Sequence, residues 1–279
     1  MLIDAKPKNF SDLLQISGLS HGTDVWLGNA QDLIKDGTCT ISNVIGTRDS
    51  IMLALINYGV EKSLSFKIME AVRKGKGLTP EFEEAMRAAG VPEWYLDSCK
   101  KIKYMFPKAH AAAYVRQAIQ FAWYKVHYPM HFYAAYFTAA PDGFDGEIVA
   151  GGKGAVKRAI AEIEAKGMDA TAKEQGMVSS LQLIMEAMSR GVRFLPVSLT
   201  KSDAKAFLPE GNAVRMPFAA LNGVGENAAA AIIAARDEDA IYSVEELRIR
   251  AKLTKSVMEI LRRNGVLDGL SETNQLTLF

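Results

Sequence analysis

The stretch from residue 106 to residue 136 constrains the fold more than any other part of the chain. It opens with Lys108 and His110 in a predicted loop and continues as a predicted helix, because small and apolar side chains recur at helical spacing from Tyr114 to Val126. The amino terminus of a helix offers unpaired N–H groups and a partial positive charge. With Lys108 and His110 beside it, this end suits an anion such as a phosphate. A buried helix with a hydrogen-bonded core histidine is the alternative, and the residues alone leave both open.

Two motifs in the chain resemble those of a known family. The first reads FPKAHAAAY from Phe106 to Tyr114 and continues to Trp123, Lys125, His127, Tyr128 and Pro129. It resembles the fingers of the bacterial replicative DNA polymerase, the DNA polymerase III α subunit of family C. The second motif, ISGLSHGTDVW from Ile16 to Trp26, narrows the resemblance to the PolC type of Gram-positive bacteria. The resemblance covers essentially the whole chain. It implies template-directed DNA synthesis from deoxynucleoside triphosphates by the parent protein, of which this chain resembles the C-terminal portion.

Composition and charge restrict the setting in which the chain works. Apolar residues make up 49% of the 279 residues and charged residues 23%, which is typical of a globular protein with a sizeable core. The net charge is only +1, so a surface for nucleic acid must come from local clusters of basic residues. Cys39 and Cys99 are the only cysteines, which favours a reducing, cytoplasmic compartment. No apolar run reaches the roughly 18–20 residues of a membrane span, so we expect no membrane partner.

Arg48 is the first candidate for contact with a nucleotide. It stands at the predicted start of an apolar helix within residues 40–58, where a guanidinium can hold a phosphate by two hydrogen bonds. The alternative is a surface arginine paired with Asp49, and the residues alone favour that interpretation. The resemblance instead implies that Arg48 contacts the triphosphate, together with Lys108 and His110.

Four further residues are candidates at the same site. Tyr104 and Phe106 present aromatic faces against which a base or sugar can pack, although both equally suit a core. Ser17 and Gly18 belong to the second motif, which reads as a turn-rich stretch leading into a helix near Val25. Capping of that helix is enough to explain the polar residues there. The resemblance implies that this stretch lies near the nucleotide.

Basic residues cluster where residues 61–77 end in RKGKG. Such a run is most often a solvated helix end, and the glycines are expected to keep the loop mobile. The spacing does not fit a phosphate-binding P-loop, because the trailing Ser or Thr is absent. The resemblance implies that Lys74 and Lys76 contact template or nucleotide phosphates.

A third motif, Gly223-Val224-Gly225 followed by alanines and isoleucines, is similar to a helix-hairpin-helix. In such a motif the glycines allow a tight turn, and backbone N–H groups hold a DNA phosphate without reading bases. No strand is predicted before the glycines, which argues against a dinucleotide-binding unit. A second, degenerate hairpin follows at residues 252–267, where Lys255 lies among basic residues that predict salt-dependent binding to duplex DNA.

The last residues form a polar lead-in, residues 271–274, followed by large apolar side chains. Such groups on a tail favour docking onto a partner. The tail resembles the peptide by which bacterial proteins bind the sliding clamp, and the anchors that this implies are Gln275, Leu276, Leu278 and Phe279. A tail that folds back onto its own domain is the alternative.

The sequence predicts a mainly α-helical protein in several parts. Residues 1–140 form a helical fingers region, which ends at a linker of glycines and carboxylates, and residues 141–205 form a helical connection. Residues 206–270 carry the helix-hairpin-helix units of a duplex-binding region, and residues 271–279 form a short flexible tail. The partners implied are primer–template DNA, a deoxynucleoside triphosphate and the sliding clamp.

Catalytic residues, cofactors and metal ligands are not expected within this chain. A polymerase needs two metal ions held by carboxylates of the palm, and no Asp-x-Asp pair lies on a strand-like segment here. His127 and His131 do not fit a metal site, because no glutamate accompanies them and Pro129 interrupts the helix. The resemblance implies that the palm aspartates, with Mg²⁺, precede this chain, and its abrupt start reads as that of a fragment.

Two other interpretations remain open from the sequence. One is a stand-alone, non-catalytic adaptor that binds DNA and the clamp. The other is a nucleotide-binding enzyme of another class, which needs a self-contained metal site. In the polymerase interpretation, the fragment on its own is expected to bind and not to polymerise.

Overall fold

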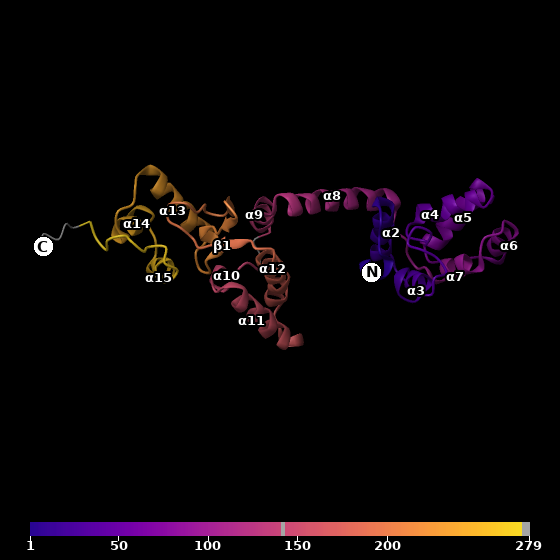
Figure 1. The fold of residues 1–279 in the computed structure, drawn as a ribbon, viewed down its shortest axis with the longest axis horizontal. Helices are drawn as coiled ribbons and strands as arrows, with labels where there is room; N and C mark the ends of the chain where they lie inside the picture. Colours follow the sequence, from indigo (N-terminus) through magenta and orange to yellow (C-terminus); the bar gives the residue numbers. More distant parts are fainter. Residues whose placement is uncertain (141–142, 275–279) are drawn as a thin grey trace. The chain divides into compact units, whose positions relative to one another are not determined.

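The computed structural model describes residues 1–140 and 143–274, which form two compact units (Figure 1). The first unit spans Met1–Gln120, and the second begins at Phe121. Each unit has a hydrophobic core of its own. The mainly α-helical class predicted from the sequence is confirmed. None of the helices in the described ranges combines the length and apolar character needed to cross a membrane.

Short helices build the first unit. They are α1 (Leu2–Ala5), α2 (Phe10–His21), α3 (Gln31–Lys35), α4 (Arg48–Asn57), α5 (Lys62–Arg73), α6 (Pro80–Ala88), α7 (Glu93–Lys101) and the beginning of α8 (Lys108–His127). An irregular turn, Trp26–Ala30, precedes α3. The helices α4 and α5 pack against each other and completely bury Ile51, Leu55 and Ile68 in the core.

Local capping sets where these helices begin. The Asn9 side chain accepts a hydrogen bond from the N–H of Asp12 at the start of α2, and the Glu61 carboxylate does the same for the first turn of α5. Thr79 caps α6, whose first residue is Pro80. In the sequence, Thr79 and Pro80 predict a helix start and the run from Gly90 to Pro92 a stop and restart, and α6 and α7 confirm these two short helices.

The second sequence motif is helical where a turn-rich stretch was predicted. Helix α2 continues to His21, so that prediction is wrong for residues 16–21. Gly18 gives the physical reason. A Cβ at this position would lie 2.0 Å from the carbonyl oxygen of Gly46, so the glycine allows a helix to pack directly on the backbone that leads into α4.

Helices and a small sheet form the second unit. The helices are α9 (Pro129–Ala139), α10 (Gly146–Ala150), α11 (Gly152–Ala165), α12 (Ala172–Ser189), α13 (Glu226–Glu238), α14 (Val244–Arg250) and α15 (Lys255–Arg263), with 3-10 turns at Gly167–Asp169 and Phe218–Ala220. The strands are β1 (Arg193–Leu195), β2 (Leu208–Glu210) and β3 (Ala213–Arg215). Their order is β1-β3-β2, with β1 parallel and β2 antiparallel to β3. The sequence from Arg190 to Val197 predicts a turn and a short strand, and that strand is β1; the other two strands were not predicted.

The division between the units falls inside α8, before the predicted boundary at residue 140. Burial explains the difference. Tyr133, Ala134 and Phe137 of α9 belong to the core of the second unit, so that helix is committed to the second unit before the linker begins. A domain boundary predicted from the composition of a loop takes no account of the core into which the preceding helix packs.

Candidate functional site

Two hydrogen bonds join the starts of α4 and α8. The N–H of Arg48 donates to the carbonyl of Phe106 at 3.2 Å, and the carboxylate of Asp49 accepts from the N–H of Lys108 at 2.7 Å. Asp49 is therefore the cap of α8. Because α8 begins at Lys108, both Lys108 and His110 lie in its first turn and not in the predicted loop. The junction brings together Arg48, Phe106 and Lys108, three of the predicted nucleotide contacts.

The guanidinium of Arg48 keeps its hydrogen-bonding groups available for an anion. Its Nε lies 3.9 Å from the Asp49 carboxylate, which is too far for a hydrogen bond, and 36% of its side chain is exposed. Within the described part of the chain, the guanidinium makes no hydrogen bond. Asp49 is thus near enough to balance some of the charge, yet it leaves the forked donors free for a bidentate contact.

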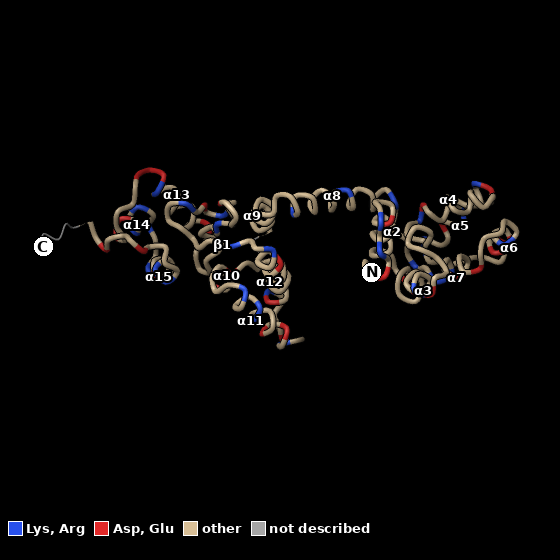
Figure 2. Tube along the Cα trace, in the orientation of Figure 1, with Lys and Arg blue, Asp and Glu red and all other residues tan. Residues whose placement is uncertain are grey.

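The amino terminus of α8 is less electropositive than the sequence alone suggests. The Asp49 carboxylate accepts the hydrogen bond of the Lys108 N–H and brings a negative charge to the first turn of α8. The helix itself carries Lys108, Arg116 and Lys125 and no acidic residue, as Figure 2 shows. What this end offers an anion is therefore the side chains of Arg48 and Lys108 more than the helix dipole.

Four rings form a row from the end of α2 along the start of α8. The ring centroids of His21 and Phe106 are 4.9 Å apart, and those of Phe106 and His110 are 5.0 Å apart. The centroids of His110 and Tyr114 follow at 4.6 Å. Phe106 is half-buried, while the other three are exposed, so the row offers ring faces for packing. His21 and Tyr114 were missed as site residues, although the four-residue spacing from His110 was a usable signal for Tyr114.

The remaining predicted contacts of the first unit differ in exposure. Tyr104 is held by its backbone, since its carbonyl accepts from the N–H of Thr23 at 3.0 Å, and the residue is 43% exposed. Ser17 is half-buried, and its carbonyl lies 3.0 Å from Nδ1 of His21. Gly18 is buried in the packing of α2 described above, so it shapes the junction without facing solvent.

Ion pairs order the basic segment at the end of α5. Lys74 lies 3.0 Å from the carboxylate of Glu70, which Arg73 also contacts. The hydrogen bond from Arg73, with Lys74 beside it, lowers the pKa of Glu70 to about 2. Lys76 is exposed and has no acidic partner in the described ranges. Of the two predicted lysines, Lys76 is the one whose charge is left for a phosphate.

The first of two hairpins in the second unit carries the predicted glycine motif. Residues 221–225 connect the second 3-10 turn to α13. Gly223 has φ +92°, and a Cβ there would lie 2.6 Å from Cδ1 of Ile260, so the turn depends on glycine. Val224 is buried, and Gly225 caps α13 without a side-chain bond. The first N–H groups of α13 are therefore open to a ligand.

The second hairpin repeats this backbone with different residues. It runs from α14 through residues 251–254 into α15. Lys252 adopts φ +50°, Leu253 is buried, and Thr254 caps α15. These positions match the positive-φ glycine, the buried valine and the capping glycine of the first hairpin. A lysine with a positive φ costs roughly 1–2 kcal/mol relative to a lysine in an unstrained conformation. The hairpin looks degenerate in sequence because this lysine stands where the first hairpin has a glycine.

Helix α10 anchors both hairpins. The carboxylate of Asp145, which caps α10, accepts a hydrogen bond of 2.5 Å from the Asn222 side chain in the first hairpin. The carboxylate of Glu147 accepts from Arg263 and Asn264 at the end of α15. The Arg263 hydrogen bond, followed by that from Asn264, keeps the pKa of Glu147 below its usual range. The two hairpins thus share one short helix as their support.

The basic cluster predicted at the second hairpin divides into two groups. Arg248, Lys252 and Lys255 are exposed and have no acidic partner among the residues that the structure describes. The other arginines are engaged in ion pairs, Arg250 with Glu246, Arg262 with Glu272 and Arg263 with Glu147. Of these unpaired cations, Arg248 lies in α14, while Lys252 lies on the turn and Lys255 at the start of α15, where the helix N–H groups also point.

The predicted clamp anchors, Gln275, Leu276, Leu278 and Phe279, lie outside the described residues. The chain just before them is held against α14, because the carbonyl of Ser271 accepts from the N–H of Val244 at 2.9 Å. Across residues 1–140 and 143–274, no group of three or more histidine, cysteine or carboxylate side chains could hold a metal ion.

Comparison with known proteins gives matches in both units. Residues 1–90 match the family model of the bacterial DNA polymerase III alpha subunit finger domain, and residues 191–276 match that of the helix-hairpin-helix motif. All 279 residues are similar to proteins named DNA polymerase III PolC-type, at 55% identity in Halalkalibacterium halodurans, 53% in Bacillus subtilis and 52% in Caldanaerobacter subterraneus. The chain spans only 20%, 19% and 20% of the lengths of these three relatives.

Proposed function

We propose that this chain, which is homologous along its whole length to one part of the PolC-type DNA polymerase III proteins, is the fingers and duplex-binding portion of a replicative DNA polymerase. The observation that carries the proposal is the 51–55% identity maintained over all 279 residues. Primer extension from deoxynucleoside triphosphates needs, in addition, a palm whose carboxylates hold Mg²⁺. The contribution of this chain is to bind and position nucleotide and DNA.

The α4–α8 junction is the part of the proposal that concerns the incoming deoxynucleoside triphosphate. Arg48 donates to the phosphates as a fork, and Lys108 adds a second positive charge. Phe106 and His110, within the row of rings, offer faces for the sugar or base. Ser17, Gly18 and Tyr104 remain predictions of proximity, and Gly18 acts through packing.

The two hairpins are the part that concerns duplex primer–template DNA. The open N–H groups at the start of α13 hold one backbone phosphate, and Lys252 and Lys255 at the second hairpin hold another. Because helix α10 supports both hairpins, they act on one duplex in a fixed spacing. Such contacts to the backbone carry no base specificity, as a replicative enzyme requires. Lys76 of the first unit is proposed to add a template phosphate contact, and Lys74 can add another only by leaving its ion pair with Glu70.

Duplex binding tests this proposal through its dependence on salt. The 279-residue chain is titrated with duplex DNA at several salt concentrations, and the logarithm of the binding constant is expected to fall linearly with that of the salt concentration, by about 0.9 for each phosphate held. Lys252→Ala and Lys255→Ala should each weaken binding and make the slope shallower by about 1. Lys173→Ala, an exposed and unpaired lysine on α12, is the matched control and should change neither. A slope equal in all three variants would contradict the proposed interface.

Clamp binding is proposed for the tail, with Gln275, Leu276, Leu278 and Phe279 as anchors. Its support is the pattern of polar lead-in and large apolar residues. Removal of residues 275–279 should abolish binding of the purified chain to the sliding clamp and leave its affinity for duplex DNA unchanged. If the intact, folded chain does not bind the clamp, the tail assignment is wrong while the rest of the proposal stands.

A further inference from the structure

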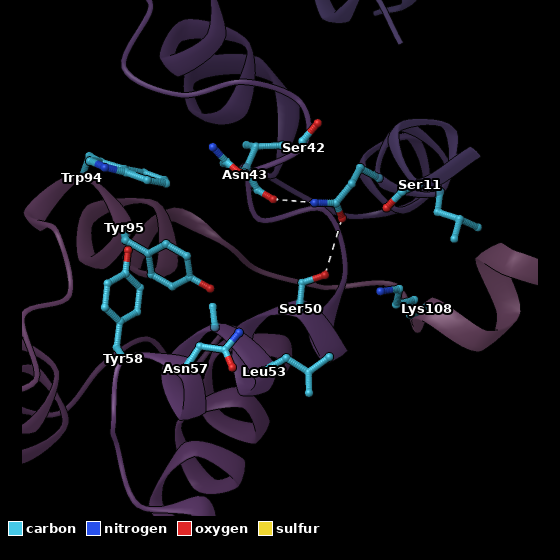
Figure 3. Close-up of a pocket in the computed structure, with 14 residues that line it drawn as sticks. Ser11, Ser42, Asn43, Ser50, Leu53, Asn57, Tyr58, Trp94, Tyr95 and Lys108 are labelled. Atoms are coloured by element: carbon cyan, nitrogen blue, oxygen red, sulfur yellow. Dashed lines mark hydrogen bonds between the residues drawn. The ribbon is translucent and has the colours of Figure 1, made fainter. Parts of the chain in front are cut away.

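A cavity of about 550 Å³ opens in the first unit. It lies between the first half of α2, the loop before α4, α4 itself and α7 (Figure 3). This volume is within the range of sites that hold small organic molecules. Arg48, Phe106 and His110 do not line it, and Lys108 is its one residue in common with the proposed triphosphate contacts. The function proposed above gives this cavity no role.

One of the residues that line the cavity carries a buried hydroxyl group. Tyr95 of α7 is only 4% exposed, yet its hydroxyl makes no hydrogen bond in the described part of the chain. Figure 3 shows this hydroxyl directed into the cavity, toward Asn57 of α4. The ring is held by the edge of Trp94, with centroids 5.4 Å apart. Buried polar groups are nearly always hydrogen-bonded, and no described residue supplies a partner for this hydroxyl.

The hydroxyl of Tyr95 is a hydrogen-bond donor for which the described residues provide no acceptor. Burial, with a smaller contribution from Cys99, raises the pKa of Tyr95 well above its usual value, so the group stays protonated. Two other polar side chains of the lining already have partners of their own. The Gln15 side chain donates to the carbonyl of Val44 at 2.8 Å, and Ser50 lies 2.7 Å from the hydroxyl of Thr47.

The rest of the lining describes the chemistry of the missing acceptor. Among the described residues, no carboxylate lines the cavity, and Lys108 is the one charged residue of its lining. Tyr58 and Trp94 supply further ring surface at the same end as Tyr95. Asn43 and Asn57 present amide groups that can both donate and accept. Aromatic faces with neutral amides suit a flat, uncharged molecule that carries its own acceptors and donors on its edge.

We propose that this cavity binds an uncharged, planar heteroaromatic molecule whose carbonyl oxygen or ring nitrogen accepts the hydrogen bond of the Tyr95 hydroxyl. The ring of the ligand packs against Tyr58 and Trp94, and the side-chain amides of Asn43 and Asn57 hydrogen-bond to donors and acceptors on the edge of that ring. The site is separate from the phosphate contacts at Arg48, so it is open to small aromatic ligands that carry no phosphate.

Ligand binding to the 279-residue chain tests the site. Caffeine, nicotinamide and uridine, three uncharged heteroaromatic carbonyl compounds, are each titrated and followed by saturation-transfer NMR and calorimetry. At least one should bind with saturable, stoichiometric behaviour. Tyr95→Phe removes only the hydroxyl and should weaken that binding about tenfold. Its melting temperature should stay equal or rise, because the variant loses an unsatisfied buried group and no bond.

Two control variants separate this site from a general effect of the substitutions. Tyr133→Phe removes another buried tyrosine hydroxyl, in the second unit, and should leave ligand binding unchanged. Arg48→Ala should weaken binding of a deoxynucleoside triphosphate and leave that of the uncharged probe intact. The proposal is overturned if none of the three probes binds at millimolar concentration, or if Tyr95→Phe binds the successful probe as tightly as the native chain.

Discussion

Asp49 decides what Arg48 can do. A carboxylate next in sequence to an arginine is expected to pair with it, but here the Asp49 carboxylate accepts from the N–H of Lys108, a residue far along the chain. The guanidinium is left beside a charge of opposite sign without a hydrogen bond to it. One acidic side chain thus caps α8 and keeps Arg48 accessible for a phosphate.

Replacing Arg48 by lysine tests whether the fork or only the charge matters. Arg48→Lys keeps the positive charge and loses the bidentate geometry, so we expect the dissociation constant for a deoxynucleoside triphosphate to rise about tenfold. Titration of the 279-residue chain with the triphosphate measures it. Arg116→Lys, an exposed arginine of α8 without an ion pair among the described residues, should leave the constant unchanged. Equal affinities for the native and Arg48→Lys chains would remove Arg48 from the site.

Gly18 gives a prediction about packing. Gly18→Ala places a methyl group against the carbonyl of Gly46, and we expect the free energy of unfolding of the first unit to fall by about 1–3 kcal/mol. Gly176→Ala in α12 has no atom within 4 Å of the added Cβ, so it should be neutral or slightly stabilising. Urea unfolding of both variants measures the difference. A Gly18→Ala chain as stable as the native one would mean that α2 and the backbone before α4 are not in contact.

At the level of elements, the anchor on α10 has a defined pH dependence. Glu147→Gln removes the charge that Arg263 contacts, and because the carboxylate is largely solvated we expect a loss of stability of at most about 1 kcal/mol. The folded pKa of Glu147 is lowered, so its contribution is present above the unfolded pKa near about 4.3 and is lost as the pH falls through the folded value.

The measurement for Glu147 is the difference in unfolding midpoint between the native and Glu147→Gln chains from pH 7 to pH 3. The difference should shrink as the pH falls below about 4.3. Glu259→Gln, an exposed and unpaired glutamate on α15, should show no difference at any pH. A gap between native and Glu147→Gln that stays constant over this range would show that the ion pair adds nothing.

Elements whose signals are local were predictable from the sequence. Thr79 and Pro80 predicted the start of α6, and Gly223 predicted the first hairpin, because a cap or a positive φ is decided within a few residues. The capping of α8 by Asp49 was not predictable, since the two partners meet only in the folded unit. Gly18 was misread as a turn residue for the same reason, because the backbone it packs against is distant in sequence.

In the candidate site, too, features with local sequence signals were predictable and contacts between distant segments were not. Sequence motifs named Arg48, Phe106 and Lys108, and the structure brings these three together at one junction. The row that adds His21 to Phe106 depends on how α2 ends beside α8, which no spacing in the sequence encodes. The strands β2 and β3 escaped prediction because three-residue strands are defined by pairing and carry little pattern of their own.

For the whole molecule, the two cores predict two separate unfolding events. Ile51 and Ile232 are both fully buried, the first in the core of the first unit and the second in that of the second. Ile51→Ala and Ile232→Ala should each cost about 2–5 kcal/mol, and each should lower the melting temperature of its own unit only. Calorimetry of the 279-residue chain measures both transitions. A single transition that both variants shift equally would show that the units unfold as one.

If the two hairpins bind duplex DNA as proposed, their matched backbones make the second unit a bivalent binder. Once one hairpin holds a phosphate, the other meets the same duplex at the high effective concentration that a fixed spacing provides. Dissociation of the duplex then requires both contacts to break at the same time, while a single contact can break and form again. The unit can thus combine weak individual contacts with a long residence time, and step along a backbone without leaving it.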